Sequence, residues 1–145
     1  MRITPVTDHT FSDAIVLLQQ NKLPVEDINR NTPLFTLHDD QHLLGIVGIE
    51  ISGDAALLRS LCINEDHRNS GGGRLLVTFI ENYAQEKGIK EMYLLTTTAA
   101  SFFSKRGYKV TDRNMVPAGI LQMSEFSFVC PHSATVMKKE LSLFN

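Results

Sequence analysis

The sequence of 145 residues contains only two cysteines and no strong excess of either charge. Cys62 and Cys130 are too few for a disulfide framework, and they do not form a C-x-x-C pair. The net charge of -2 and the isoelectric point near 6.2 give no general attraction to nucleic acid or to an anionic membrane. These absences argue against a disulfide-stapled domain and against nucleic acid or membrane as a partner.

Long hydrophobic runs are also missing from the chain. No apolar run reaches the roughly 18 residues that a transmembrane helix needs, and the N-terminal segment MRITPVTDHT lacks the apolar core of a signal peptide. The apolar and charged fractions, 43% and 21%, are those of an ordinary globular protein, and no repeat or linker interrupts them. We therefore expect one soluble, cytoplasmic domain that spans residues 1–145.

Hydrophobic periodicity predicts a helix, then antiparallel strands, and then alternating strands and helices. The expected elements are a helix within 10–24, strands within 33–40, 42–52 and 55–63, a helix over about 72–87, a strand within 90–96, a short helix within 98–107, a strand within 108–112, helical turns within 116–126 and a strand within 134–141. Thr97 or Thr98 is the expected cap of the short helix. The second half of this order predicts two parallel strands that are joined by a crossover helix.

Three glycines, Gly71 to Gly73, lie between the strand that ends near Ile63 and the helix that follows. Main-chain N–H groups at a helix start have no partner within the helix, and the helix dipole favours an anion there. Arg68 adds a positive charge to the same turn. The spacing fits neither a Walker loop, which needs Lys-Ser or Lys-Thr, nor a dinucleotide fingerprint, which needs glycine where Leu76 stands. The stretch predicts a site for a phosphorylated ligand; a flexible surface turn is the alternative.

The pattern Arg68-x-x-Gly71-x-Gly73, together with the later AASFFSKRGY, resembles the acetyl-CoA-binding motifs of the GNAT-type N-acetyltransferase superfamily. The resemblance covers Leu57 to Tyr108. It implies an α/β fold: a mixed, twisted sheet with helices on both faces and two parallel central strands that splay apart. It also implies acetyl-CoA as cosubstrate, no metal, a small-molecule amine as acceptor, and the homodimer that is common in the superfamily.

The resemblance assigns the coenzyme to the first of the splayed strands and to the glycine turn. The pantetheine arm is expected along Leu61, Cys62 and Ile63, and a main-chain N–H near Leu61 and Cys62 is the expected oxyanion donor. The remaining coenzyme contacts that it implies are Arg68, Asn69, Ser70, Gly71, Gly72, Gly73 and Arg74 around the diphosphate and Phe103 on the short helix.

The resemblance fails at the catalytic acid. The superfamily usually has a tyrosine four residues before the glycine that closes the short helix, and Phe103 stands there in this sequence. Phenylalanine cannot donate a proton, and Tyr108 and Ser104 are close in sequence but not at the matching position. Glu65 and His67, just after the strand, are candidates for the general base, or they are solvated loop charges. We assign no catalytic acid or base.

Arg59 interrupts an otherwise apolar strand and is followed by Ser60. A charge at such a position is costly unless it is paired or faces a wet cleft. One interpretation is that Arg59 and Ser60 bind the acceptor, with the guanidinium clamping an acidic group. The other is a structural ion pair with an acid on a neighbouring strand, such as Glu50.

A narrower resemblance concerns TTTAASFFSKRGY and the later FSFVCPHSATVMKKEL, which are similar to a subgroup of arsenic-resistance N-acetyltransferases. It implies an amino-acid-like acceptor, including arsenic- or phosphorus-containing analogues. Loops within 23–33 and 116–126 are expected to shape the acceptor site. Because the usual tyrosine is absent, a non-catalytic module that binds acyl-CoA and senses it or regulates a partner is the alternative function.

Overall fold

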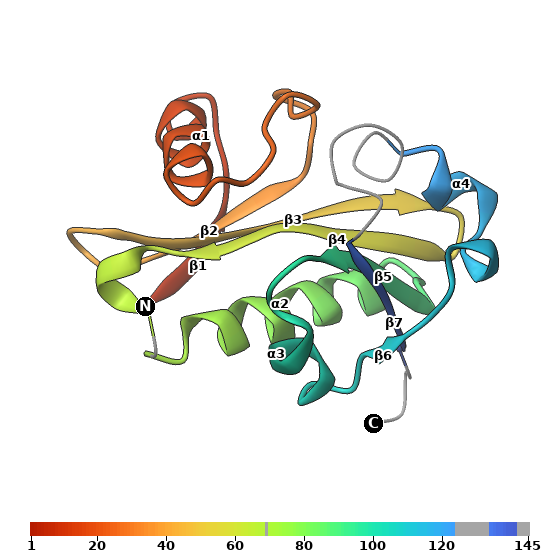
Figure 1. Cartoon of the computed structure of the whole chain (residues 1–145). Coiled ribbons are helices and arrows are strands. Elements are labelled where there is room, and N and C mark those ends of the chain that lie inside the picture. The colour runs from red at the N-terminus through yellow and green to blue at the C-terminus, as the bar shows by residue number, and fades with distance from the viewer. Residues whose placement is uncertain (69, 124–133, 142–145) are drawn as a thin grey trace.

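The computed structural model describes residues 1–68, 70–123 and 134–141. Strands and helices alternate along most of the chain (Figure 1). The elements are β1 (Arg2–Pro5), α1 (Phe11–Gln20), β2 (Leu34–His38), β3 (Leu43–Ser52), β4 (Ala55–Ile63), the 3-10 turn η1 (Glu65–His67), α2 (Gly72–Glu86), β5 (Glu91–Thr96), α3 (Ala100–Ser104), β6 (Lys109–Val110), the 3-10 turn η2 (Arg113–Met115), α4 (Ala118–Leu121) and β7 (Thr135–Glu140).

The strands form one mixed sheet in the order β1-β2-β3-β4-β5-β7-β6. Every neighbouring pair is antiparallel except β4 and β5, which are parallel as the crossover helix predicts. These two strands pair only where Ala55–Leu57 meets Glu91–Tyr93. Beyond that point they diverge, so their C-terminal halves are not hydrogen-bonded to each other. The predicted mixed sheet with splayed parallel central strands is confirmed.

Helices cover both faces of this sheet, with α1 and α4 on one face and α2 and α3 on the other (Figure 1). Because successive side chains of a strand point to opposite faces, the same strands contribute to the apolar layers on both faces of the sheet. Leu34 and Ile46 belong to the buried cluster around Leu18 of α1, whereas Phe35 belongs to the cluster around Leu76 of α2. None of the helices in the described part of the chain has the length and apolar character of a bilayer-spanning helix.

Two details of the predicted order differ from the structure. β1 was not predicted, because it has only four residues, pairs with β2 alone and ends on Pro5. The cap of α3 was predicted wrongly: its N-cap is Ala99, and the N–H of Ala99 donates to Oγ1 of Thr96 at 2.9 Å. The chain turns at the very end of β5, which brings the hydroxyl of Thr96 rather than Thr97 or Thr98 within reach. Part of the predicted turns within 116–126 lies outside the described residues.

A buried ion pair ties the segment after α1 to the centre of the sheet. Arg59 of β4, whose side chain is only 1% exposed, donates from Nη2 to Oδ1 of Asp27 at 2.7 Å and from Nη1 to Oε1 of Glu50 at 2.6 Å. The side chain of Asp27 is itself 9% exposed. Breaking such a pair leaves a buried charge without its partner. The cluster therefore fixes the segment between α1 and β2 against β4.

Core packing predicts a large difference between two adjacent leucines of α2. Leu76 is fully buried against the sheet, whereas Leu75 is 44% exposed. We expect Leu76→Ala to lower the free energy of unfolding by about 2–5 kcal/mol, through lost burial and the cavity it leaves. Leu75→Ala should cost less than about 1 kcal/mol. Urea denaturation of both variants tests this, and equal losses would show that α2 does not pack as described.

The ion pair of Asp27 predicts a pH-dependent loss of stability. Burial alone would raise the pKa of Asp27, but the hydrogen bonds and charge of Arg59 outweigh it and hold the pKa below the usual 3.8. A carboxylate with a lowered pKa stabilises the fold above its unfolded pKa, and that stabilisation is lost as the pH falls through the folded pKa. Asp27→Asn should therefore destabilise the protein by about 1–3 kcal/mol at pH 7. The difference in the free energy of unfolding between wild type and Asp27→Asn should narrow below about pH 4.

The matched control is Asp8→Asn, because Asp8 pairs with Arg30 at 3.2 Å but both side chains are mostly exposed. An exposed pair contributes at most about 1 kcal/mol. Chemical denaturation between pH 3 and 7 measures both variants. A gap between wild type and Asp27→Asn that is independent of pH would contradict the role of the ionised carboxylate.

Candidate functional site

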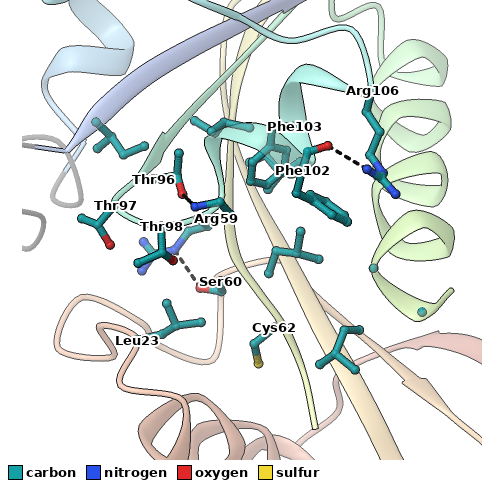
Figure 2. Close-up of a pocket in the computed structure, with 18 of the residues that line it drawn as sticks. Leu23, Arg59, Ser60, Cys62, Thr96, Thr97, Thr98, Phe102, Phe103 and Arg106 are labelled. Carbon is teal, nitrogen blue, oxygen red and sulfur yellow. Dashed lines mark hydrogen bonds between the residues drawn. The ribbon is translucent and has the colours of Figure 1, made fainter. Parts of the chain in front are cut away.

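A cleft of about 870 Å³ opens where β4 and β5 separate. This volume is within the range of small-molecule and cofactor sites. Its walls come from the segment after α1, from β4, from the turn before α2, from the end of β5 and from α3 (Figure 2). The residues that line it are Lys22, Leu23, Pro24, Leu58, Arg59, Ser60, Leu61, Cys62, Ile63, Arg68, Gly71, Gly72, Gly73, Arg74, Leu94, Leu95, Thr96, Thr97, Thr98, Ala99, Phe102, Phe103, Arg106 and Ala134.

Each of these three positions favours glycine for a different physical reason. Gly71 is the N-cap of α2 and has a φ of 87°, in the left-handed region that side chains disfavour. Gly72 is buried, and a Cβ there would lie 3.1 Å from side-chain atoms of Ile63 and Leu37. A Cβ on Gly73 would lie 3.1 Å from the ring of Phe102. The glycines therefore let α2 start close against the sheet and α3, directly beside the cleft.

The start of α2 is suited to an anion. The helix has 15 residues, and its N-cap, Gly71, has no side chain that could cap the first turn. Its first N–H groups and its dipole therefore present partial positive charge at the glycine turn. Arg68 contributes its charge nearby, with Nη2 donating to Oδ1 of Asn21 at 2.6 Å and Nε donating to the carbonyl of Ile63 at 3.4 Å. Of the predicted diphosphate residues, Ser70 does not line the cleft, and those that do are Arg68, Gly71, Gly72, Gly73 and Arg74. Asn69 lies outside the described residues.

The middle of β4 is irregular at Ser60. Arg59 pairs with Gly48 and Cys62 pairs with Ile46, so two residues of β4 stand opposite one residue of β3. Such a bulge re-aims side chains and often lies beside an active site. Ser60 has a φ of 60°, which is uncommon for a residue with a side chain. The bulge at residues 60 and 61 lies in the wall of the cleft and includes the first of the predicted pantetheine residues 61–63.

Cys62 lies in this wall but is not suited to act as a nucleophile. The residue is 8% exposed, and burial raises the pKa of its thiol to about 12. A thiol is nucleophilic as the thiolate, so this one is inert at neutral pH. Cys130 lies outside the described residues. Within the described ranges, no group of three or more His, Cys, Asp and Glu side chains is arranged to hold a metal ion.

The predicted ion pair between Arg59 and Glu50 is confirmed, and Asp27 is a second partner that the sequence did not reveal. The same guanidinium also donates from Nε to Oγ of Ser60 at 3.2 Å (Figure 2). An acidic group of an acceptor could reach Arg59 only by competing with two carboxylates of the chain itself. The clamp role of Arg59 therefore stays a prediction, while its structural role is observed.

Phe103 lines the cleft, as predicted, and is 5% exposed. Its ring packs edge to face on Phe102 at 5.1 Å and on Tyr108 at 5.5 Å. Tyr108 and Ser104 do not line the cleft. The hydroxyl of Tyr108 donates to Oε2 of Glu81 at 2.9 Å, and burial raises the pKa of this tyrosine well above 10. Neither residue replaces the missing tyrosine.

The candidate bases Glu65 and His67 lie on η1, outside the lining of the cleft. The ring of His67 lies 5.5 Å from that of His42, which belongs to the turn between β2 and β3. Arg106 lines the cleft without having been predicted. Its guanidinium lies 3.6 Å above the ring of Phe102 and donates from Nη1 to the carbonyl of Phe102 at 2.7 Å (Figure 2). It thus holds Phe102 against the glycine turn.

Comparison with known proteins shows which family this chain resembles. Residues 30–110 match the family model described as the acetyltransferase (GNAT) domain. An uncharacterised N-acetyltransferase of Chlorobaculum tepidum is 40% identical over 65 residues, which are 45% of this chain and 41% of that protein. An amino-acid acetyltransferase of Pseudomonas fluorescens is 35% identical over 65 residues, 45% of this chain and 15% of that protein. The chain thus spans less than half the length of either relative.

Among solved structures, N-acetylglutamate synthase of Neisseria gonorrhoeae in complex with coenzyme A and N-acetyl-glutamate superposes with a TM-score of 0.83. The match covers 97% of this chain and 35% of that one at 14% identity, so it shows a shared fold. Tetrahymena GCN5 superposes with a TM-score of 0.77 over 100% of this chain and 99% of that one, at 16% identity. The family model spans more than half of the chain, and the described sheet has the splayed strands that the motifs imply. The chain belongs to the GNAT acetyltransferase family.

Proposed function

We propose that this protein is an acetyl-CoA-dependent N-acetyltransferase that acetylates the primary amine of a small, amino-acid-like molecule. The observation that carries the proposal is the position of the start of α2, whose N–H groups are suited to an anion and which opens directly into the cleft between β4 and β5. A diphosphate needs converging N–H donors, and an extended thioester arm needs a strand with unpaired main-chain groups beside it. This site offers both next to each other.

The predicted coenzyme residues have complementary tasks in this proposal. The main-chain N–H groups of 71–73, with Arg68 and Arg74 beside them, hold the diphosphate. The exposed main chain of 61–63 pairs with the pantetheine arm, and an N–H near Leu61 and Cys62 stabilises the developing oxyanion. Phe103 packs against the arm. Acetyl-CoA supplies the activated acetyl group, and the chain's own residues orient it and exclude water.

The acceptor is expected to enter between β4 and the segment after α1, where Lys22, Leu23 and Pro24 line the cleft. An amino-acid-like acceptor is supported by the likeness to the Pseudomonas amino-acid acetyltransferase over 65 residues. Arg59 and Ser60 are its predicted contacts. An arsenic- or phosphorus-containing amino acid analogue is a narrower form of this proposal. It rests on a resemblance whose C-terminal part lies partly outside the described residues.

A second candidate function is a non-catalytic module that binds acyl-CoA and senses it or regulates a partner. Phe103 favours this alternative, because it leaves the cleft without the tyrosine that the superfamily commonly uses. The two functions share the coenzyme site and differ in turnover. Release of the thiol of coenzyme A in the presence of an amine therefore separates them.

Calorimetry and a thiol-release assay test the proposed function. We expect coenzyme A and acetyl-CoA to bind the purified protein at one site per chain. Acetyl-CoA with a panel of amino acids, polyamines, peptides and organic arsenicals should then release thiol with at least one amine. Binding without release across the whole panel would support the sensor, and absence of binding would overturn both candidate functions.

Substitution of Gly71 tests whether the turn holds the coenzyme. Gly71 and Gly53 both have positive φ, and a Cβ on either would meet nothing within 4 Å. Gly71→Ala and Gly53→Ala should each cost about 1–2 kcal/mol of stability because of backbone strain. Only Gly71→Ala should also weaken coenzyme A binding, by about tenfold, because it distorts the N–H groups that face the diphosphate. Calorimetry measures both variants, and equal affinities would place the diphosphate elsewhere.

A further inference from the structure

The cleft lacks a hydroxyl where the superfamily commonly has a tyrosine, and the transfer reaction still produces a thiolate that has to be stabilised. Phe103 occupies that position. The hydroxyl of Tyr108 donates to Glu81, and neither Tyr108 nor Glu81 lines the cleft. Thr96 uses its Oγ1 to accept from the N–H of Ala99 at the end of β5. The hydroxyls in the lining of the cleft belong to Ser60, Thr96, Thr97 and Thr98, and of these only Ser60 lies on β4, next to residues 61–63.

Ser60 is a hydroxyl in the wall formed by β4, and its main chain holds it in an uncommon conformation. Its φ is 60°, it lies in the bulge opposite β3, and it is 8% exposed. Backbone strain at such a position persists only when the surroundings hold it, and it gathers at functional sites. The bulge turns the side chain of Ser60 into the cleft, where Figure 2 shows it between Arg59 and Cys62.

The hydroxyl of Ser60 is oriented by a charged donor. Nε of Arg59 donates to Oγ of Ser60 at 3.2 Å, so one lone pair of the oxygen is occupied. Asp27 and Glu50 hold the guanidinium in place with contacts at 2.7 and 2.6 Å, and the side chain is only 1% exposed. Within the described part of the chain, no group accepts a hydrogen bond from the hydroxyl of Ser60. A positive charge on one side of the hydroxyl polarises it toward donation on the other.

The position of Ser60 along β4 matches the reacting end of the coenzyme. In the proposed function, on which this inference rests, the diphosphate lies at 71–73 and the pantetheine arm runs back along β4 from Ile63 to Leu61. Ser60 lies three residues before Ile63 on the same strand. It is the next residue after those that the arm contacts, and its side chain lies in the same cleft.

We propose that the hydroxyl of Ser60 donates a hydrogen bond to the thioester sulfur and stabilises the departing thiolate. The amine nitrogen bonds to the acetyl carbon, the carbon–sulfur bond breaks, and its electron pair stays on sulfur. Ser60 keeps its proton, because a serine hydroxyl is a far weaker acid than a thiol. The proton of the amine goes to water, and water protonates the thiolate. Ser60 is then a catalytic residue, and Arg59, Asp27 and Glu50 are positioning residues.

The acidity of bound coenzyme A tests this assignment without knowledge of the acceptor. The ultraviolet absorbance of the thiolate is followed against pH for coenzyme A bound to the full chain, with desulfo-coenzyme A as the blank. In wild type we expect the bound thiol to be more acidic than in Ser60→Ala, by about tenfold in its acid dissociation constant. The affinity for desulfo-coenzyme A should be the same in both proteins.

Companion variants distinguish the hydroxyl from a general disturbance of the cleft. Ser60→Gly should show the same loss of thiol acidity, because glycine tolerates the positive φ. It replaces Ser60→Ala in the test if that variant does not fold. Asp27→Asn should give a smaller loss of thiol acidity in the same direction, because it acts through Arg59. Thr97→Val removes another hydroxyl from the lining of the cleft and should leave the thiol unchanged.

Two results would contradict the proposal in different ways. If the thiol of bound coenzyme A is equally acidic in wild type and in Ser60→Ala, the role of Ser60 is overturned and the proposed function stays intact. Failure of wild type to bind coenzyme A would overturn the proposed function itself. With an amine that the thiol-release assay identifies, Ser60→Ala should lower kcat about tenfold or more and change the KM for acetyl-CoA less than about twofold.

Discussion

The short stretch over which β4 and β5 pair determines where the site lies. Only Ala55–Leu57 and Glu91–Tyr93 are joined, and beyond them the two strands diverge. The gap between them becomes the cleft, and the crossover helix α2 begins at the open end of that gap. The topology therefore places the glycine turn, which is suited to an anion, next to the unpaired edge of β4.

The charged cluster of Arg59, Asp27 and Glu50 is a second constraint on the structure of the site. Arg59 connects three elements, because it holds Asp27 from the segment after α1, Glu50 from β3 and the hydroxyl of its own neighbour Ser60. Its carboxylate partners balance a charge that would otherwise be costly inside the sheet. The same arrangement fixes the segment after α1 and holds the hydroxyl of Ser60 in the lining of the cleft. In our proposal, both stability and chemistry depend on this guanidinium.

Local patterns in the sequence predicted most of the fold, and contacts between distant segments account for what they missed. The helix that starts at the glycines and the apolar strand before it were predicted because their periodicity and turn residues are local. β1 was not predicted, since a four-residue edge strand is defined by its neighbour rather than by its own pattern. Asp27 was missed for the same reason, because its place in the site depends on how the segment after α1 folds back onto β4. Arg106 was missed although its contacts with Phe102, four residues earlier, are local.

A crystal structure of the protein with coenzyme A tests the central claim most directly. The account predicts diphosphate oxygens within hydrogen-bond distance of the main-chain nitrogens of Gly71–Gly73, with the pantetheine arm between β4 and β5 and its sulfur beside Ser60. A coenzyme bound elsewhere on the molecule, with the glycine turn making no contact to its phosphates, would contradict the account.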